Sequence, residues 1–366
     1  MQQAESLFEH RDASVGATLR VFGLHLISLA VPLYTLAFVA TGPHPGLCVL
    51  AWTIVVPLIW VLDRTSGPAL HPPVRLVASW PFDGILVVLS AVQIANVVLG
   101  LRLVREAGLR SVDAWVMILL VGVSSGYSAI VVAHELVHRK ERGLFRLGRL
   151  LLCTVFYDHF TTEHVRGHHA RVGTDEDSAT ARYGETFEAF WRRTVPGQLK
   201  SAWRIEARRL GDEQMKWHDP RLLRSSVLHG FLAETALAGG LGVAFGPAAL
   251  VAFFLQAYVA VRLLEAVNYF EHYGLRRVGK KVRPVDSWDS NSWFTLFARV
   301  GLSRHADHHA YASRPFQALR PWEESPKLPF GYIVTTTMAV FANKRLQRLL
   351  SRELERRKLG PFAEQP

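Results

Sequence analysis

Residues 114–138 read AWVMILLVGVSSGYSAIVVAHELVH, an apolar run that ends in two histidines. Its apolar part, residues 114–133, has about the 20 residues that a helix needs to cross a hydrocarbon core of about 30 Å. Five further runs of similar character occupy residues 21–40, 47–62, 84–104, 227–245 and 248–267. Six such runs predict an all-α, polytopic membrane protein with about six transmembrane helices. Together with a histidine-rich region outside the spans, they form a single predicted membrane domain over residues 1–366.

The distribution of Lys and Arg predicts the orientation in the membrane. Positive side chains gather between the fourth and fifth runs and after the sixth, as in Arg139, Lys140, Arg142, Arg276 and Arg277. Because Lys- and Arg-rich loops stay in the cytoplasm, residues 134–226 and 268–366 and both termini are predicted to be cytoplasmic. Helices one to four then fall in residues 21–133 and helices five and six in 227–267, within a bacterial-type inner membrane. Arg102, Arg105 and Arg110 oppose this bias, and we expect two of them to snorkel from a helix end.

The net charge of +11 raises the question of a nucleic-acid partner. We predict none, because the positive charge flanks the membrane spans and no zinc-finger spacing or Gly-rich phosphate loop accompanies it. The two cysteines, Cys48 and Cys153, are too few and too far apart for a metal knuckle, and we expect both to be reduced.

Nine of the sixteen histidines lie in four short stretches. Three imidazoles fall within EHVRGHH (residues 163–169) beside a carboxylate, a pattern more typical of metal binding than of core packing. On a helix His164 and His168 would share one face, as would the histidines of HADHH (residues 305–309). The candidate metal ligands are His134, His138, His164, His168, His169, His272, His305, His308 and His309.

The HELVH stretch (residues 134–138) also matches the zinc-protease signature, in which Glu135 would be the general base. A catalytic zinc takes three protein ligands and a water, whereas nine imidazoles suffice for two ions at four to five each. Neutral imidazole suits iron, zinc, copper and nickel. A heavy-metal transporter is disfavoured because most spans lack polar residues.

An acid stands beside a histidine in each stretch, and these acids are the candidate catalytic residues: Glu135, Glu163, Glu271 and Asp307. Such carboxylates fix the tautomer and orientation of a ligating imidazole or bind the metal directly. The acidic run at residues 175–177 is predicted to be a solvated loop that pairs with nearby arginines.

The histidine stretches resemble those of the membrane fatty acid desaturase/hydroxylase superfamily and, within it, of the integral-membrane alkane 1-monooxygenases. The likeness covers about residues 21–341 and rests on HELVHRK (134–140), EHVRGHH (163–169), NYFEHYG (268–274), PVDSW (284–288), RHADHHA (304–310) and LPFGY (328–332). Asp286 departs from it, since many members are expected to carry His there, and this bears on the assignment of substrate. The resemblance implies a six-helix fold, two Fe ions bound as a diiron centre by the nine histidines, and O₂ as co-substrate.

The same resemblance implies the activity and the partners. We expect hydroxylation of the terminal carbon of an alkane, with membrane lipid, an apolar small-molecule substrate and a rubredoxin or ferredoxin-type electron donor as partners. A xylene-type side-chain hydroxylase and an acyl-lipid desaturase or hydroxylase are alternatives within the superfamily. A zinc intramembrane metalloprotease is the alternative from another class.

Two large side chains of the second run are candidates for binding substrate. Trp60 and Trp52 stand a little over two helical turns apart, and an inward-facing Trp would limit the length of alkane that fits a channel between spans. The alternative is that these rings anchor the helix at the headgroup level.

Overall fold

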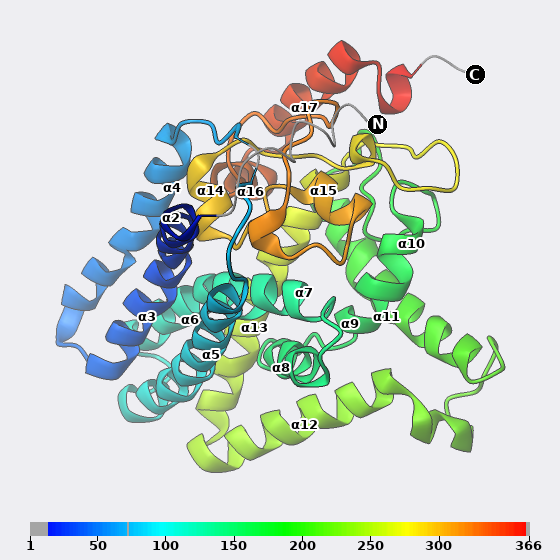
Figure 1. The fold of residues 1–366 in the computed structure, drawn as a ribbon. Helices are drawn as coiled ribbons and strands as arrows, with labels where there is room; N and C mark the ends of the chain where they lie inside the picture. Colours follow the sequence, from blue (N-terminus) through cyan, green and yellow to red (C-terminus); the bar gives the residue numbers. More distant parts are fainter. Residues whose placement is uncertain (1–13, 72, 364–366) are drawn as a thin grey trace.

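The computed structural model describes residues 14–71 and 73–363, and this part of the chain is built from helices (Figure 1). Within it six helices are long and apolar enough to cross a membrane, which confirms the predicted fold class. These six spans are Val15–Thr41, Gly46–Thr65, Trp80–Ala107, Val112–Leu136, Ser226–Phe245 and Pro247–His272. In the described residues the only β-type pairing consists of two isolated bridges, Pro68 with Ser292 and Asp289 with Lys327.

Three of the spans change helix type along their length. The first joins α2 (Val15–His25) to α3 (Ala30–Thr41) through the 3₁₀ turn Leu26–Leu29, and the second joins the 3₁₀ helix Gly46–Ile54 to α4 (Val55–Thr65). The fourth joins α6 (Val112–Ser125) to α7 (Val131–Leu136) through the π-helical turn Gly126–Ile130. The other three are the uninterrupted helices α5 (Trp80–Ala107), α12 (Ser226–Phe245) and α13 (Pro247–His272).

Shorter helices lie between the fourth and fifth spans and after the sixth. The first set is α8 (Arg142–Cys153), α9 (Phe160–Thr162), the π-helical turn Glu163–His168, α10 (His169–Arg171), α11 (Phe187–Arg209) and the 3₁₀ turn Pro220–Arg224. The second set is α14 (Trp293–Ala298), α15 (His305–Ala310), α16 (Tyr332–Phe341) and α17 (Asn343–Arg357), with 3₁₀ turns at Pro284–Asp286, Phe316–Ala318 and Gly360–Phe362.

The two ends of the spans differ in the residues that surround them. At the histidine end, which we define as the end where α7 and α13 finish, the chain passes into the histidine stretches. At the opposite end the loops hold one another: His44 Nδ1 lies 2.8 Å from Asp113 Oδ1, and Arg105 Nη1 donates to the Ala244 carbonyl at 2.8 Å. Arg102 pairs with Glu106 there at 2.7 Å. Two of the three arginines that opposed the predicted orientation, Arg102 and Arg105, therefore have partners at the helix ends there.

A buried layer of amide and hydroxyl side chains crosses the centre of the bundle. Gln93 of α5 donates to Ser125 Oγ and Thr154 Oγ1, each at 3.0 Å, and accepts from Ser128 Oγ at 2.8 Å. Gln256 of α13 donates to the Thr154 carbonyl at 2.9 Å and accepts from Ser125 Oγ at 3.2 Å. These bonds satisfy polar groups that hydrocarbon cannot, and they hold three spans around the π-helical turn of the fourth.

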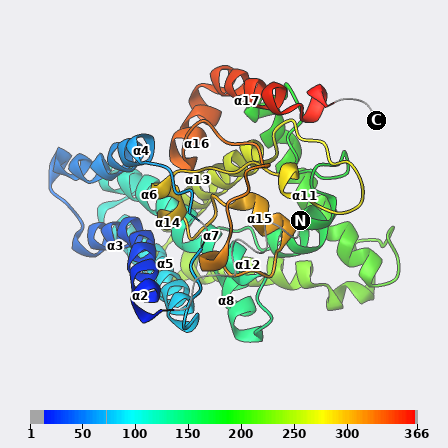
Figure 2. The same ribbon diagram turned by 45° about the horizontal axis from the view of Figure 1, so that its top comes forward.

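The C-terminal helices α14 to α17, orange to red in Figure 1, cover the histidine end as a cap, and Figure 2 shows α15 near the middle of this cap. Asp63, near the end of α4, fixes the cap to the second span. Its carboxylate accepts from Thr295 Oγ1 at 2.6 Å in α14 and from the Val334 amide at 3.0 Å in the first turn of α16. Ser292 Oγ donates to it at 2.9 Å. One buried carboxylate thereby stabilises the N-terminal ends of two cap helices, where negative charge is favourable.

We predict that Asp63→Ala destabilises the protein more than a typical exposed substitution does. The change leaves three donors without their acceptor, and hydrogen bonds to a charged group contribute about 1.5–3 kcal/mol each in mutational series, with less than additive sums. The midpoint of thermal unfolding in detergent should fall by several degrees. The matched control is Thr65→Ala, since its exposed hydroxyl bonds only to the Val61 carbonyl of the same helix. Equal midpoints for the two variants would contradict the role given to Asp63.

Candidate metal centre

All nine predicted ligand histidines meet at the histidine end of the bundle. His134 and His138 come from α7 and the residues just after it, and His272 is the last residue of α13. The others come from the π-helical turn before α10, from the start of α10 and from α15 in the cap. Eight of the rings form two groups of four, and in each group the candidate ligand atoms lie within 4.8 Å of one another. Group one is His134, His138, His164 and His308, and group two is His168, His272, His305 and His309.

His169 connects the two groups. Its Nε2 lies 3.1 Å from Nε2 of His164 and 3.1 Å from Nε2 of His308, both in group one. Its ring also stacks on His309 of group two, with centroids 4.3 Å apart and an angle of 22° between the planes. The nine imidazoles therefore form one continuous layer.

The spacing of ring nitrogens within each group suits a shared ion. In group one the Nε2 atoms of His138 and His164 are 3.1 Å apart, and in group two those of His272 and His305 are 3.2 Å apart. Two imidazole nitrogens bound at right angles to one ion at about 2.1 Å lie about 3 Å from each other. The observed separations are close to that value.

The environment of the rings also favours a metal. Burial lowers the pKa of His138 to about 4, and it holds the pKa of His164, His308 and His309 well below the usual value. Neutral imidazole is the form that binds metal ions. Among the described residues, His134 Nε2 and both ring nitrogens of His309 are buried without a hydrogen-bond partner. Because an unpartnered buried polar atom costs about 1–3 kcal/mol, these nitrogens fit a metal-binding site.

The π-helical turn changes which histidines meet. The α-helical spacing predicts that His164 and His168 share one face, and their ring centroids lie 5.5 Å apart, yet the structure assigns the two rings to different groups. The turn Glu163–His168 has one more residue per hydrogen-bonded ring than an α-helix, and Nε2 of His164 lies 3.1 Å from Nε2 of His169. The histidines of α15 also divide: His308 joins group one, and His305 and His309 join group two.

The four candidate acids occupy different positions relative to the rings. Glu271 touches the centre, since its Oε2 lies 3.2 Å from His305 Nε2. Glu163 pairs with Arg171 at 3.1 Å, and Asp307 pairs with Arg314 and accepts from Trp322 Nε1 at 2.7 Å. The last two thus bind neighbouring cations and fix the chain on which the histidines stand.

Glu135 is placed unlike the base of a zinc protease. Its Oε1 lies 2.9 Å from Arg139 Nη2 and accepts from the Phe316 amide at 3.3 Å. Arg139 also pairs with Asp83 at 3.0 Å. A carboxylate held in this way anchors the cap to the end of α7, and this geometry does not favour the protease interpretation.

Asp177 is a site residue that the sequence argument missed. The run 175–177 was predicted to be a solvated loop, which is wrong for Asp177: it is 2% exposed, and its Oδ2 lies 2.9 Å from His168 Nδ1. Thr180 Oγ1 donates to the same oxygen at 2.6 Å. Burial alone would raise the pKa of Asp177, but the charge of His168 and these hydrogen bonds outweigh it and lower the pKa to about 2. The fold brings Asp177 back to His168. The only signal in the sequence was that this acid stands nine residues after a candidate ligand.

The two predicted substrate tryptophans lie at different depths of the second span, and Trp52 is the one toward the end opposite the histidine layer. Trp52 packs against Tyr34, Phe38 and His44, and His44 binds Asp113 at the opposite end of the bundle. Asp113 is separated from the first ligand of the fourth span by about 30 Å along the helix. Trp60, further along the second span, is 37% exposed.

Comparison with known proteins extends these observations. The sequence profile of the fatty acid desaturase family matches residues 113–337, which contain all nine histidines. An alkane 1-monooxygenase of Pseudomonas putida is 32% identical over 312 residues, covering 82% of this chain and 75% of the relative. The alkane 1-monooxygenase 1 of Pseudomonas aeruginosa is 40% identical over 232 residues, covering 61% of this chain and 59% of the relative.

A second kind of relative is the xylene/toluene monooxygenase hydroxylase component XylM of Pseudomonas putida, 30% identical over 214 residues. That match covers 57% of this chain and 56% of the relative. The chain spans about three fifths of the length of the first curated relatives that it matches.

We predict that replacing a single histidine of either group removes bound metal. His309→Ala takes away a ring of group two that contacts His305 of the same group and the connecting ring of His169. The metal content per chain of the purified protein should therefore fall by about one ion or more. His218→Ala, which alters an exposed ring in edge-to-face contact with Trp217, should keep the full content. Elemental analysis of both variants makes the measurement, with circular dichroism as the check on folding. A fully loaded His309→Ala protein would show that this ring is not a ligand.

Proposed function

This chain belongs to the fatty acid desaturase family, and from that premise we propose that it is a membrane-embedded monooxygenase that hydroxylates the terminal carbon of alkanes. The observation that carries the proposal is the pair of buried four-histidine groups at the ends of the spans. Support comes from seven relatives named alkane 1-monooxygenase, at 32–40% identity. We propose iron in both groups, because imidazole suits this metal and the family resemblance implies a diiron centre.

In the proposed reaction R–H, O₂, two electrons and two protons give R–OH and one H₂O. When bound, the iron pair supplies the activation of O₂ that the cleavage of an unactivated C–H bond requires. The protein holds the ligand rings in fixed orientations, which Asp177 does for His168 and Glu271 does for His305. Such partners fix the tautomer and direction of an imidazole.

The surroundings of the layer suit an apolar substrate. The histidines adjoin a core of buried apolar side chains that includes Leu136, Val137 and Phe160, whose ring stacks on His164 at 4.7 Å. Water is therefore kept from the rings on the membrane side. We propose that the substrate enters from the lipid between spans and that only its terminal carbon reaches the layer.

The electrons must come from another protein. Cys48 is exposed in the second span and Cys153 is buried, so the two cysteines cannot hold an iron–sulfur cluster together. We propose a rubredoxin or ferredoxin-type donor, and we place the histidine end in the cytoplasm of a bacterial cell, as the Lys and Arg distribution requires. Residues 1–13 and 364–366, the chain ends that are also predicted to be cytoplasmic, lie outside the described residues.

A xylene-type hydroxylase is the second candidate, and the similarity to XylM favours it over the remaining alternatives. Both reactions insert one oxygen atom into a methyl C–H bond, and they differ in the shape of the substrate that must fit between the spans. An acyl-lipid desaturase or hydroxylase is left with the family membership alone, because no desaturase is among the relatives described above.

We predict about two irons per chain and O₂-dependent formation of terminal alcohols from medium-chain n-alkanes. The test uses the purified protein in lipid nanodiscs with an added reductant, elemental analysis, and a panel of n-alkanes, xylenes and fatty acids analysed by gas chromatography. Stoichiometric zinc with peptide hydrolysis would replace the proposal by the protease alternative. Conversion of xylenes but not of alkanes would replace it by the second candidate.

Trp60 supplies a prediction about substrate length. If its ring limits the channel, Trp60→Ser admits longer alkanes, while the preferred short alkane reacts more slowly because it is positioned less well. Relative rates over a series of chain lengths in both proteins give the answer. Trp80→Ser is the matched control, since Trp80 is 75% exposed at the start of α5. A length profile that does not shift would assign Trp60 to the headgroup region.

A further inference from the structure

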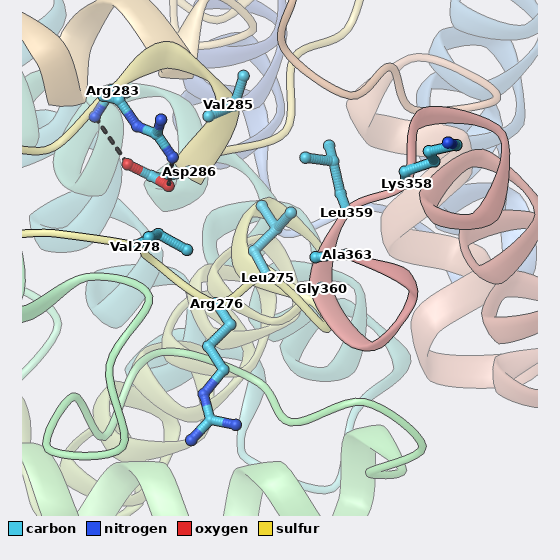
Figure 3. A pocket seen from close by; sticks show the side chains of 10 residues that line it. All are labelled: Leu275, Arg276, Val278, Arg283, Val285, Asp286, Lys358, Leu359, Gly360 and Ala363. Carbon is cyan, nitrogen blue, oxygen red and sulfur yellow. Dashed lines mark hydrogen bonds and ion pairs between the residues drawn. The ribbon is translucent and has the colours of Figure 1, made fainter. Parts of the chain in front are cut away.

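Two adjoining hollows open on the surface of the histidine end. One has a volume of about 440 Å³ and the other of about 230 Å³, and Leu275, Arg276 and Gly360 line both of them. We call the two together the Arg276 groove. Its larger part is drawn in Figure 3, where Leu275, Val285 and Leu359 surround the hollow and Arg276 extends toward the loop before α11. The groove therefore lies between the segment after α13 and the segment after α10.

The wall of this groove leads directly to group two. Asp177 lines the smaller hollow, and the same carboxylate holds His168 Nδ1 at 2.9 Å. On the other side, the Leu275 amide donates to the carbonyl of His272 at 3.3 Å. Two of the four group-two histidines are thus close to the groove. One side chain, Asp177, separates it from His168, and the short backbone segment from His272 to Leu275 connects it to His272.

The loops that form the wall are fixed to each other. The Arg277 amide donates to the Gly173 carbonyl at 2.8 Å, and the Gly274 amide donates to the Ala181 carbonyl at 2.9 Å. Gly173 has a φ of +75° and its position faces Arg277 at close range, so a side chain there would be strained and would push the loops apart. The two loops between the surface and His168 are therefore held together by backbone hydrogen bonds.

Charge and polarity indicate what the groove receives. Its interior is apolar at Leu275, Val285 and Leu359, and its rim carries exposed Arg276 and Arg283. Each arginine pairs with an acid of the same lining, Arg276 with Asp175 at 3.4 Å and Arg283 with Asp286 at 3.9 Å, so the excess of positive charge comes from the neighbouring lysines. Lys280 and Lys281 follow on the exposed loop between the two arginines. An apolar centre with a positive rim is complementary to a protein surface that has an apolar centre and a negative rim, and such charges steer association.

We propose that the Arg276 groove is the docking site of a small acidic one-electron carrier protein and that electrons enter the metal centre at group two, by way of Asp177 and His168. This inference rests on the proposed function, which consumes two electrons for each O₂. The carrier is oxidised by one electron in each of two encounters, and the centre is reduced by two. Group one, which takes His134 and His138 from the end of the fourth span and the residues just after it, is left to face the substrate.

The experiment measures binding directly, with the full chain in nanodiscs of zwitterionic lipid and a purified acidic rubredoxin as the probe. The double variant Arg276→Glu/Arg283→Glu should weaken the dissociation constant about tenfold or more at low salt, and added salt should reduce the difference. The matched control is Arg204→Glu/Lys216→Glu, with the same change in net charge at exposed residues that line neither hollow. The control should bind as the wild type does.

The single variant Arg276→Gln removes one charge without reversing it, so it is a milder change that tests the same contact with less risk of misfolding. Unchanged metal content in all variants shows that the centre is intact. Equal weakening by the groove pair and the control pair would overturn the proposal, as would wild-type protein that does not bind the probe at low salt. Unchanged affinity for rubredoxin in the groove double variant would likewise overturn the proposal. Wild-type protein that binds rubredoxin but forms no alcohol would refute the proposed function and leave the docking site standing.

Discussion

The gathering of nine imidazoles in one layer, seven of them buried, is the constraint on which the rest of this structure depends. Each ring carries a nitrogen that must accept a hydrogen bond or bind a metal, and water is largely excluded from the layer. The chain meets this constraint by ending the fourth and sixth spans at the layer and by covering it with a cap that supplies three more rings. Stability and metal binding are therefore linked, because the centre joins segments that have few other reasons to meet.

Charged side chains around the layer hold the pieces in place without occupying the centre. Glu135 joins the end of α7 to the Phe316 turn, and Asp307 holds the segments that follow α15 through Arg314 and Trp322. Asp63 attaches the cap to the second span. Each is a buried carboxylate with several donors, the arrangement that makes burial of a charge tolerable. Most acids beside the histidines in sequence thus hold the surrounding chain, whereas Glu271 and Asp177 contact ligand rings.

Two π-helical turns set the register of the ligands. The turn Gly126–Ile130 ends four residues before His134, the first histidine of α7, and the turn Glu163–His168 contains two candidate ligands itself. A π-helical turn inserts one residue into a helix and rotates everything after it. The amide layer of Gln93 and Gln256 binds Ser125, just before the first turn, and Ser128, within it. Polar side chains in the middle of the bundle thereby support the position of ligands at its end.

The two histidine groups differ in what surrounds them. Group one takes two of its rings from the end of the fourth span, whose apolar residues are the most deeply buried of all the spans. Group two is connected to the surface through Asp177 and the residues after His272. A single continuous layer, joined by His169, therefore has an apolar side and a side close to the solvent. This asymmetry suits a centre that meets a lipid-soluble compound and a soluble protein at once.

The amino-acid sequence by itself determined the six spans and the identity of the nine histidines. Apolar runs of fixed length leave few options in a membrane, and residues such as His134 and His272 stand at the ends of those runs. The tertiary structure alone decided how the rings are shared between the groups, because the division of His164 from His168 depends on a π-helical turn that α-helical spacing does not predict. It also decided that Asp177 is buried against His168 and that Glu135 faces Arg139. Local sequence determines where an apolar helix runs, whereas the direction of a polar side chain depends on partners that only the packing of distant segments brings within reach.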